Sequence, residues 1–540
     1  MVNPSTVLNS RSQVRILPRR FLNLSPVFLV AIVATILSLL AFFYFFANGM
    51  TNVYGDGVAH VNISRKVVDS LDHGFWRRYI QIGSPWLPLQ TVLMLPFVAN
   101  DWMWRTGVAG SIVSMFSFVV AAVSIFLLAT RIYSKEDDWI REVLPIISAG
   151  IFVLNPSVLY MQTTPMSELL FMATLVLAVW LLQRWRDDQT TKALLLAGGA
   201  MSLATLSRYE AWPVALLSVL LVLLNVVGGW KEKLKGACLF AFTVAVGPLY
   251  WFWHNWAIYD NAFEFLSGPN SARGIAFQNR VNFAWSSIFV GYALLDFVVI
   301  VAAVAVCAGP IVLLIGVTGL AKSLVTNKRV LLERSPLLLL ILPFIFQVFS
   351  VYRGEIQIFP LSAFGLLNIR YGLPHILGVA LFAPATVLIF KERARRWALV
   401  GVIVVVAVQY GSVVSEGPSQ LAVYQEGFRN GVNSRPARQY SRVASFLTTN
   451  PPRTLILMHT GALGPVVSKG GLEFRNIIHE GTERWHQLNE GIPGDVGSVI
   501  FQDGDPLDSL IRENPKLTRS LSEDFEQRMV SGNVRVYGRP

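Results

Sequence analysis

The amino-acid sequence is divided into apolar segments that are each long enough to cross a lipid bilayer. The first is residues 27–47, "VFLVAIVATILSLLAFFYFFA", and a helix needs about 20 such residues to span a hydrocarbon core of about 30 Å. Only 14% of the 540 residues are charged, whereas soluble domains average about 25%. The chain has too few polar residues to cover a soluble core, so we predict a polytopic membrane protein.

Ten further apolar segments follow the first, which predicts an all-α membrane part with about eleven transmembrane helices. A secretory signal peptide has a shorter apolar region and a small-residue cleavage site, so we interpret residues 27–47 as an uncleaved span. The other predicted spans lie at residues 108–130, 143–160, 166–183, 193–207, 212–228, 237–254, 286–320, 336–351, 373–390 and 397–414.

The lysines and arginines fall mainly in every second connection between these segments, and such connections face the cytoplasm in membrane proteins. We therefore predict a cytoplasmic N-terminal segment at 1–23, a transmembrane domain at 24–415 and an extracytoplasmic domain at 416–540. The net charge of +12 then reflects topology, and no nucleic-acid partner is predicted. The basic segments lie at residues 11–20, 131–141, 184–192, 231–235, 322–334 and 391–396.

The first outer loop, residues 48–107, begins with a lone carboxylate between two glycines, in "VYGDGVAH". Asp56 precedes a predicted amphipathic helix at residues 58–71. One interpretation is that Asp56 caps this helix or belongs to a turn, because Gly-Asp-Gly is common in turns and Asp favours helix N-termini. The other is a catalytic carboxylate, since a loop of this length on a membrane protein is usually functional.

Further charged side chains lie at the outer ends of predicted spans. The stretch "TTPMSELLF" predicts a helix with Thr164 as its N-cap and Pro165 at its first position, so that Glu168 complements the helix dipole. The stretch "TLSRYEAWP" places Arg208 and Glu210 beside apolar runs, where a charge is costly without a partner. One interpretation is a local Arg208–Glu210 pair. Neighbouring helical residues face each other poorly, however, so we expect each of these charges to have another partner.

Arg370 and Tyr371 stand at the start of the tenth predicted span, in "NIRYGLP". An arginine there can extend its side chain to lipid headgroups. It can instead bind one phosphate through two hydrogen bonds from its guanidinium group. One carboxylate and two arginines at span ends on one face together fit a site for an anionic, membrane-borne substrate.

Residues 416–540 contain shorter apolar runs and more charge. "RTLILMH", "GSVIFQD" and "NVRVYGR" are predicted strands, and "SRPARQYSRVASFLTT" and "DPLDSLIREN" are predicted helices. About 120 residues suffice for a small α/β domain. The sequence has no glycine-rich nucleotide-binding fingerprint and no metal-ligand spacing of cysteine and histidine, so no cofactor is assigned.

The order of these motifs resembles the GT-C superfamily of integral-membrane glycosyltransferases. The resemblance rests on an acidic residue in a long first outer loop, followed by "LNPSVLYMQTTPMSELLF", "TLSRYEAWP" and "NIRYGLP". It covers about residues 21–415 and is nearest to the branch with the protein O-mannosyltransferases and the lipid A aminoarabinose transferase. It implies an enzyme that takes a sugar from a polyprenyl-phosphate carrier and passes it to a protein, lipid or glycan acceptor at the outer face of the cell membrane.

The resemblance also implies roles for individual residues. Asp56 matches the family's acidic residue in the first loop, and Arg370 and Tyr371 resemble its late Arg-Tyr pair near the lipid phosphate. From its place at a span end on the same face, we expect Arg208 to bind this phosphate too. Many relatives have two adjacent acidic residues in the first loop, but Gly57 follows Asp56 here, so no metal ligand is assigned and a divalent metal is left open. The expected supporting residues are His60, Glu168 and Glu210.

The transfer itself needs one base. A lipid-linked phosphate leaves as an anion and, unlike the alcohol that leaves in glycoside hydrolysis, requires no acid to protonate it. Asp56 is expected to act as general base on the acceptor hydroxyl, while Arg370 stabilises the charge that grows on the phosphate oxygen. We expect Gly55 and Gly57 to let backbone and substrate approach closely around Asp56.

Two other classes of function are weighed against a transferase. A lipid or glycan transporter or flippase would show matched halves and charges in mid-span, and the sequence has neither. A non-catalytic assembly protein would act through residues 416–540. A cavity at the outer leaflet that contains Asp56 favours the transferase, whereas a path near the bilayer midplane favours the transporter.

A reporter that is active only outside the cytoplasm, fused after Pro540, is expected to be active. The reason is that the basic connections place residues 416–540 on the non-cytoplasmic side. An inactive fusion with good expression would contradict the predicted topology.

Overall fold

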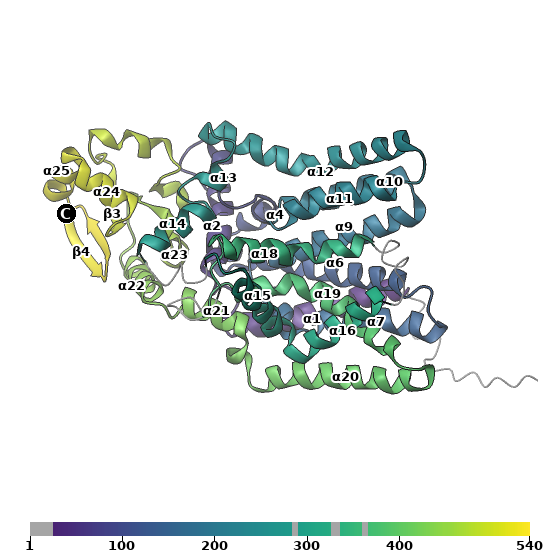
Figure 1. The fold of residues 1–540 in the computed structure, drawn as a ribbon. Helices are drawn as coiled ribbons and strands as arrows, with labels where there is room; N and C mark the ends of the chain where they lie inside the picture. Colours follow the sequence, from purple (N-terminus) through teal and green to yellow (C-terminus); the bar gives the residue numbers. More distant parts are fainter. Residues whose placement is uncertain (1–24, 283–289, 326–334, 359–365) are drawn as a thin grey trace, which may run out of the picture.

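The computed structural model describes residues 25–282, 290–325, 335–358 and 366–540. It is a bundle of helices that run side by side, with a smaller part that contains a β-sheet at one end (Figure 1). Seven helical segments among these residues are long and apolar enough to cross a membrane, and a bent helix pair brings the number to eight. The seven are α1 (Pro26–Ala47), α6 (Val108–Ile132), α9 (Glu168–Asp188), α12 (Trp230–Tyr259), η3 with α18 (Ser335–Tyr352), η4 with α19 and η5 (Ile369–Ile389), and α20 (Glu392–Ser415).

The bent pair replaces a predicted single span. Helices α15 (Ala293–Ala308) and α16 (Pro310–Val325) meet at an angle of 109°. Gly309 between them has φ +89°, a backbone conformation that favours glycine and often ends a helix. Pro310 has no backbone N–H with which to continue α15. The described part of the run at 286–320, predicted as one span, is therefore two helices, and residues 286–289 lie outside the described residues.

Three other apolar segments form short helices. Helices α7 (Asp138–Val153), α10 (Thr191–Thr205) and α11 (Ala211–Asn225) contain 15 or 16 residues, whereas a straight span needs about 20. Every predicted span contains a helix, but the count of eleven transmembrane helices stays a prediction.

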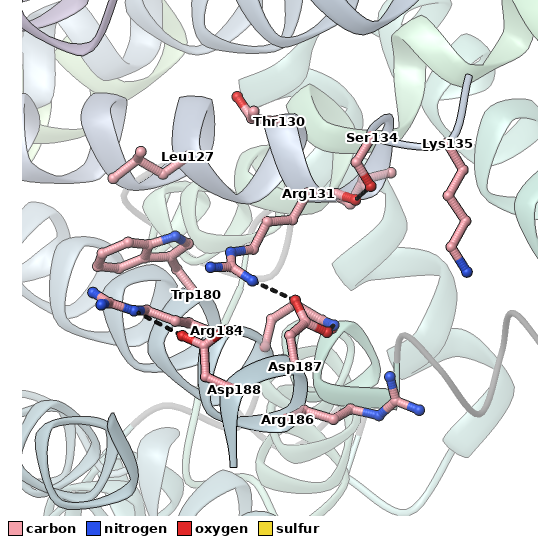
Figure 2. A pocket seen from close by; sticks show the side chains of 12 residues that line it. Leu127, Thr130, Arg131, Ser134, Lys135, Trp180, Arg184, Arg186, Asp187 and Asp188 are labelled. Atoms are coloured by element: carbon pink, nitrogen blue, oxygen red, sulfur yellow. Dashed lines mark hydrogen bonds and ion pairs between the residues drawn. The ribbon is translucent and has the colours of Figure 1, made fainter. Parts of the chain in front are cut away.

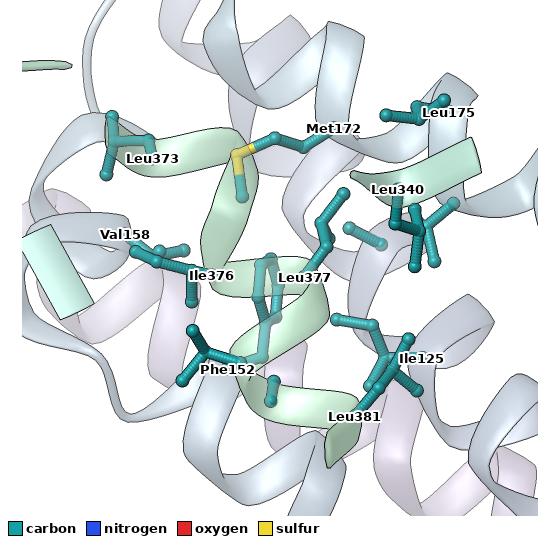
Figure 3. Close-up of a cluster of buried hydrophobic side chains, with 14 of the residues drawn as sticks. Ile125, Phe152, Val158, Met172, Leu175, Leu340, Leu373, Ile376, Leu377 and Leu381 are labelled. Atoms are coloured by element: carbon teal, nitrogen blue, oxygen red, sulfur yellow. The ribbon is translucent and has the colours of Figure 1, made fainter. Parts of the chain in front are cut away.

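Helix α19 (Ile376–Phe382) lies at the centre of the bundle. Its side chains Ile376 and Leu377 are fully buried. Around them lie Ile125 of α6, Phe152 of α7 and Met172 of α9 (Figure 3). Close packing of this kind holds helices together in a bilayer, where no water is available to drive them into contact.

The basic connections gather at the end of the bundle that faces away from the sheet (Figure 1). At this end Arg131 forms an ion pair with Asp187, and Arg395 Nη1 lies 3.2 Å from Asp137 Oδ2. These pairs join connections that are predicted to share one side of the membrane. The basic residues at 11–20 and 328–334 lie outside the described residues, and which side faces the cytoplasm stays a prediction.

The first outer loop is folded into short helices, and α2 begins three residues earlier than predicted. Asp56 lies inside the first turn of α2, whose N-cap is Tyr54. Asp56 is therefore not the helix cap, although a carboxylate in the first turn still interacts favourably with the helix dipole. The elements of the loop are α2 (Gly55–Val68), α3 (Phe75–Tyr79), η1 (Ile80–Ile82), α4 (Leu89–Val98) and α5 (Asp101–Thr106).

The C-terminal part contains a five-stranded mixed sheet with the strand order β2-β1-β3-β5-β4. Strand β1 pairs in parallel with β2 and β3, while β5 pairs antiparallel with β3 and β4. The predicted strands are β1, β3 and β5, and the predicted helices are α22 and α24. The sequence patterns miss β2, which has two residues, and β4, a largely exposed edge strand.

The bounds of this part are β1 (Leu455–Met458), β2 (Ile477–Ile478), β3 (Val496–Gln502), β4 (Glu526–Ser531), β5 (Val534–Gly538), α22 (Arg435–Thr449), α23 (Thr460–Lys469), α24 (Pro506–Glu513) and α25 (Pro515–Asp524).

The sheet and the first outer loop share one hydrophobic core. Val61 of α2, Met94 of α4 and Trp104 of α5 belong to the same buried cluster as Ile456 of β1 and Val536 of β5. Because this cluster contains residues from both parts, the sheet is held against the loop by the same burial that stabilises each of them.

Polar contacts also connect α2 to the C-terminal part. Lys66 Nζ lies 3.1 Å from Glu480 Oε1, and Asn62 Nδ2 donates a hydrogen bond of 2.9 Å to the carbonyl of Gly464. The helix that carries Asp56 is thereby fixed to the C-terminal part.

Helix α21 (Ala422–Gly431) packs closely against the residues that precede α2. A Cβ atom on Gly431 would lie 1.7 Å from the carbonyl oxygen of Val53, and one on Gly427 would lie 2.8 Å from the ring of Tyr54. A side chain at either position would therefore push the two segments apart.

Gly431→Ala is expected to lower the melting temperature of the detergent-purified protein, because overpacking of this kind costs about 1–3 kcal/mol. Gly411→Ala in α20 is the matched control, since its Cβ position has no atom within 4 Å and alanine favours a helix interior by up to about 1 kcal/mol. Equal melting temperatures of the two variants would contradict the close approach of α21 to Val53.

Candidate functional site

A network of buried charges lies at the end of the bundle that borders the C-terminal part, with Arg370 at its centre. Arg370 Nη2 donates to Asp56 Oδ2 at 2.5 Å, and Nε donates to Glu168 Oε1 at 3.1 Å. Its Nη1 forms a hydrogen bond with Glu426. The arginine is 8% exposed, so the three carboxylates supply the compensation that a buried guanidinium requires. Arg370 does not extend to lipid headgroups.

Each member of the network comes from a different element. Asp56 is in the first turn of α2, Glu168 is the first residue of α9, and Arg370 is in the 3₁₀ helix η4 (Ile369–His375). Asn368, just before η4, has φ +57°, which turns the chain into the 3₁₀ helix. Segments that are far apart in the sequence therefore meet at one guanidinium group.

Glu426 is a member of this network that the sequence analysis misses. Its carboxylate also accepts hydrogen bonds from the backbone N–H groups of Asn368, at 2.9 Å, and Arg370, at 3.3 Å. It therefore fixes the start of η4 as well as the guanidinium of Arg370. A signal exists in the sequence, because Glu426 lies on the same helix face as Val423 and is flanked by Gly427.

Arg208 connects a second part of the network. Its Nη1 donates to Glu168 Oε1 at 3.0 Å, and its Nη2 donates to Glu210 Oε1 at 2.8 Å. The local Arg208–Glu210 pair, one of the two interpretations, is present, because residues 206–210 form a turn between α10 and α11 and not a helix. The expectation of another partner holds for Arg208, which also binds Glu168.

Glu168 links the two arginines through one carboxylate oxygen. The predicted helix start at Thr164 and Pro165 is wrong: α9 begins at Glu168, and the Thr164 hydroxyl donates to the carbonyl of Met161 at 2.7 Å. Glu168 does lie in the first turn, as predicted. Its side chain is 1% exposed, and its Oε2 atom has no hydrogen-bond partner among the described residues, so its main contacts there are with the two guanidinium groups.

Two tyrosine rings flank the guanidinium groups. The Arg208 Cζ atom lies 4.9 Å from the centroid of the Tyr371 ring, and the Arg370 Cζ atom lies 5.4 Å from that of Tyr54. A cation over an aromatic face is stabilised by the ring electrons. Tyr371 therefore lies in the same network as the other predicted site residues.

His60 is buried next to this network, with its ring centroid 4.7 Å from that of Trp86. Burial lowers the pKa of His60 to about 4, although Asp56 and Glu168 favour its charged form. The imidazole is therefore neutral near pH 7. Its Nδ1 atom has no hydrogen-bond partner, so within the described residues His60 contributes packing and no ion pair.

Asp56 is the accessible carboxylate of the network. Its side chain is 47% exposed, whereas the side chain of Arg370 is 10% exposed. The space around Gly55 is open, but a Cβ on Gly57 would lie 2.9 Å from Pro165 Cγ. Gly57 therefore allows the close approach of α2 to Pro165, whereas the approach of substrate around Asp56 stays a prediction.

The network combines two guanidinium groups with four carboxylates. Within the described ranges, no group of three or more His, Cys, Asp or Glu side chains could hold a metal ion. The side chains that the structure brings together here are guanidinium groups, carboxylates and aromatic rings.

Comparison with known proteins shows likeness in fold. No family model matches the sequence, and no curated protein matches it. The structure is similar to that of ArnT from Cupriavidus metallidurans bound to undecaprenyl phosphate, with a TM-score of 0.51 and 11% identity over 95% of this chain and 97% of that one. The apo form of the same ArnT gives a TM-score of 0.50 and 12% identity over the same shares. The apo oligosaccharyltransferase of Archaeoglobus fulgidus gives 0.48 and 11%, over 88% of this chain and 69% of that one.

Because the likeness extends over nearly the full length of both chains, this chain has the same fold as ArnT, and the resemblance to the GT-C superfamily is confirmed at the level of the fold. Together with the apolar helices, it shows an integral membrane protein that crosses the membrane several times.

Proposed function

We propose that this protein is a membrane glycosyltransferase that moves a sugar from a polyprenyl-phosphate-linked donor to an acceptor hydroxyl at the extracytoplasmic face. The observation that carries the proposal is the contact between the half-exposed Asp56 and the buried Arg370 at the outer end of a GT-C fold. A base and a phosphate-binding group are thereby placed side by side, as the transfer requires.

In the proposed reaction, an oxygen of the acceptor attacks the anomeric carbon of the sugar. The bond from this carbon to the carrier phosphate breaks, and the phosphate leaves with the electron pair. Asp56 takes the proton of the acceptor hydroxyl. Arg370 and Arg208 stabilise the negative charge that grows on the leaving phosphate.

The carboxylates around the arginines hold them in place for this role. Arg208 Nε also donates to Glu210 Oε1, at 3.0 Å. A guanidinium group has five N–H donors, and the bonds to carboxylates therefore use three nitrogens of Arg370 and three of Arg208. Donors therefore remain for phosphate oxygens. Glu168 and Glu210 fix the direction of these donors and so support catalysis through the two arginines. The ring of Tyr371 packs against both guanidinium groups, and His60 supports Asp56 by packing.

The Asp56–Arg370 ion pair also requires the donor to bind before Asp56 can deprotonate the acceptor. While Asp56 accepts a hydrogen bond from Arg370 Nη2, it is a weaker base toward an acceptor hydroxyl. A donor phosphate that binds Arg370 competes for this nitrogen and releases the carboxylate. Asp56 is then a free base only when the donor is bound. It therefore does not deprotonate an acceptor that binds without a donor.

The alternative function, transport or flipping of a lipid or glycan, is less well supported. Transporters place their binding residues near the bilayer midplane. The charge network described here lies at the end of the bundle next to α2 and α21, both of which border the C-terminal part (Figure 1).

Asp56→Asn is expected to reduce transfer at least about a hundredfold, the effect typical of removing a general base. Asn has nearly the same size and can still accept a hydrogen bond from Arg370, so the melting temperature should change little. Asp138→Asn, at the exposed opposite end of the bundle, is the matched control and should keep full activity. Retained transfer in Asp56→Asn would remove Asp56 from the proposed mechanism.

Arg370→Lys and Arg208→Lys are each expected to weaken binding of undecaprenyl phosphate, because lysine keeps the charge but loses the two-pronged hydrogen bond. Binding is measured with the purified proteins in detergent, at equal folded concentration. Arg141→Lys, in a basic connection at the other end, is the control. Unchanged phosphate binding in both site variants and in Arg208→Ala would contradict a phosphate site at these arginines.

A further inference from the structure

A second site lies at the opposite end of the bundle, where α6 and α9 end. A pocket of about 640 Å³ is lined there by residues from the last turns of both helices and from the connection after α6. Figure 2 shows Arg131 and Arg184 on one side of this pocket, next to Trp180, while Lys135 and Arg186 extend toward the other side. None of these residues takes part in the network around Arg370.

Charged side chains line the pocket. Among the described residues these are the four basic side chains just named and two acidic ones, Asp187 and Asp188. Arg131 pairs with Asp187, and Arg184 Nε lies 3.3 Å from Asp188 Oδ2. These pairs hold both guanidinium groups over the pocket while they remain 30% and 45% exposed, respectively. Among the described residues, neither guanidinium group has a second carboxylate partner.

The rest of the lining is apolar or aromatic. Leu127 and Ile132 of α6 and Trp180 of α9 border the same space as the arginines. Tryptophan side chains favour the boundary between lipid headgroups and hydrocarbon. The pocket therefore combines a cationic part with an apolar part, which matches a ligand that has a phosphate group joined to hydrocarbon chains.

The position of the pocket at one end of the bundle indicates which ligand of this kind it binds. It lies at the end where the basic connections gather, away from the C-terminal part (Figure 1). Basic connections face the cytoplasm, where the membrane leaflet is rich in anionic lipids that attract lysine and arginine. Basic pockets between transmembrane helices on this side are suited to anionic headgroups.

We propose that this pocket binds the phosphate headgroup of an anionic phospholipid. The phosphate accepts hydrogen bonds from Arg131 and Arg184, and the first methylene groups of the lipid chains lie against Leu127 and Trp180. The proposal does not depend on the sugar-transfer activity, because no residue is shared with that site.

The test compares lipid binding by native mass spectrometry of the detergent-purified full chain. Wild-type protein is expected to retain dioleoylphosphatidylglycerol in preference to dioleoylphosphatidylcholine. R131Q/R184Q is expected to bind phosphatidylglycerol at least about tenfold more weakly, since each basic residue near an anionic lipid contributes a several-fold gain. K231Q/K233Q removes two charges from α12, outside the pocket lining, and should bind like the wild type.

Equal binding of the two lipids, or equal loss in both double variants, would overturn the proposal. Displacement of phosphatidylglycerol by millimolar inorganic phosphate would show a site for free phosphate and would overturn the lipid assignment. If R131Q/R184Q does not fold, a photoactivatable phosphatidylglycerol is cross-linked to the wild type. Labelled peptides from residues 127–135 and 180–188 support the site, and labelling elsewhere alone overturns it.

Discussion

The end of the bundle that borders the C-terminal part is organised by the need to neutralise one buried guanidinium group. Arg370 is surrounded by carboxylates from α2, α9 and α21, elements separated by more than a hundred residues in the sequence. A buried charge that loses a partner is destabilising by several kcal/mol. The arrangement of these elements is therefore coupled: displacement of any of them leaves an unpaired charge in a medium that cannot solvate it.

This coupling explains why the same residues serve stability and the proposed chemistry. Glu168 and Glu426 are almost fully buried and hold the arginine, while Asp56 is half exposed and able to change partners. In the proposed mechanism, the guanidinium held by the two buried carboxylates binds the anion, and the half-exposed carboxylate beside it acts as the base. Differences in burial, more than differences in residue type, separate the roles of the three carboxylates.

The sequence predicts the membrane class, the helical runs and most of the site because these depend on local patterns. Apolar runs and basic connections determine the bundle, and the motifs around Asp56, Glu168, Arg208 and Arg370 lie in the network that the structure shows. Glu426 is missed because its role depends on tertiary contact between α21 and η4.

The other errors have the same origin. The late start of α9 depends on a turn whose geometry helical periodicity does not describe. The break at Gly309 follows from a glycine-proline pair within an otherwise continuous apolar run. Local patterns predict which segments are apolar, but tertiary packing decides where each helix starts and bends.

The shared core of the sheet and the first outer loop has a consequence for biosynthesis. Asp56 is made early, but Glu426 and the strands that cover α2 come from the last quarter of the chain. While the ribosome is still adding these residues, the loop lacks its cover and Arg370 lacks one of its carboxylates. The charge network around Arg370 is therefore complete only after the C-terminal residues have reached the same side of the membrane as the loop. A nascent chain that stops in the membrane before Glu426 is added lacks a complete site.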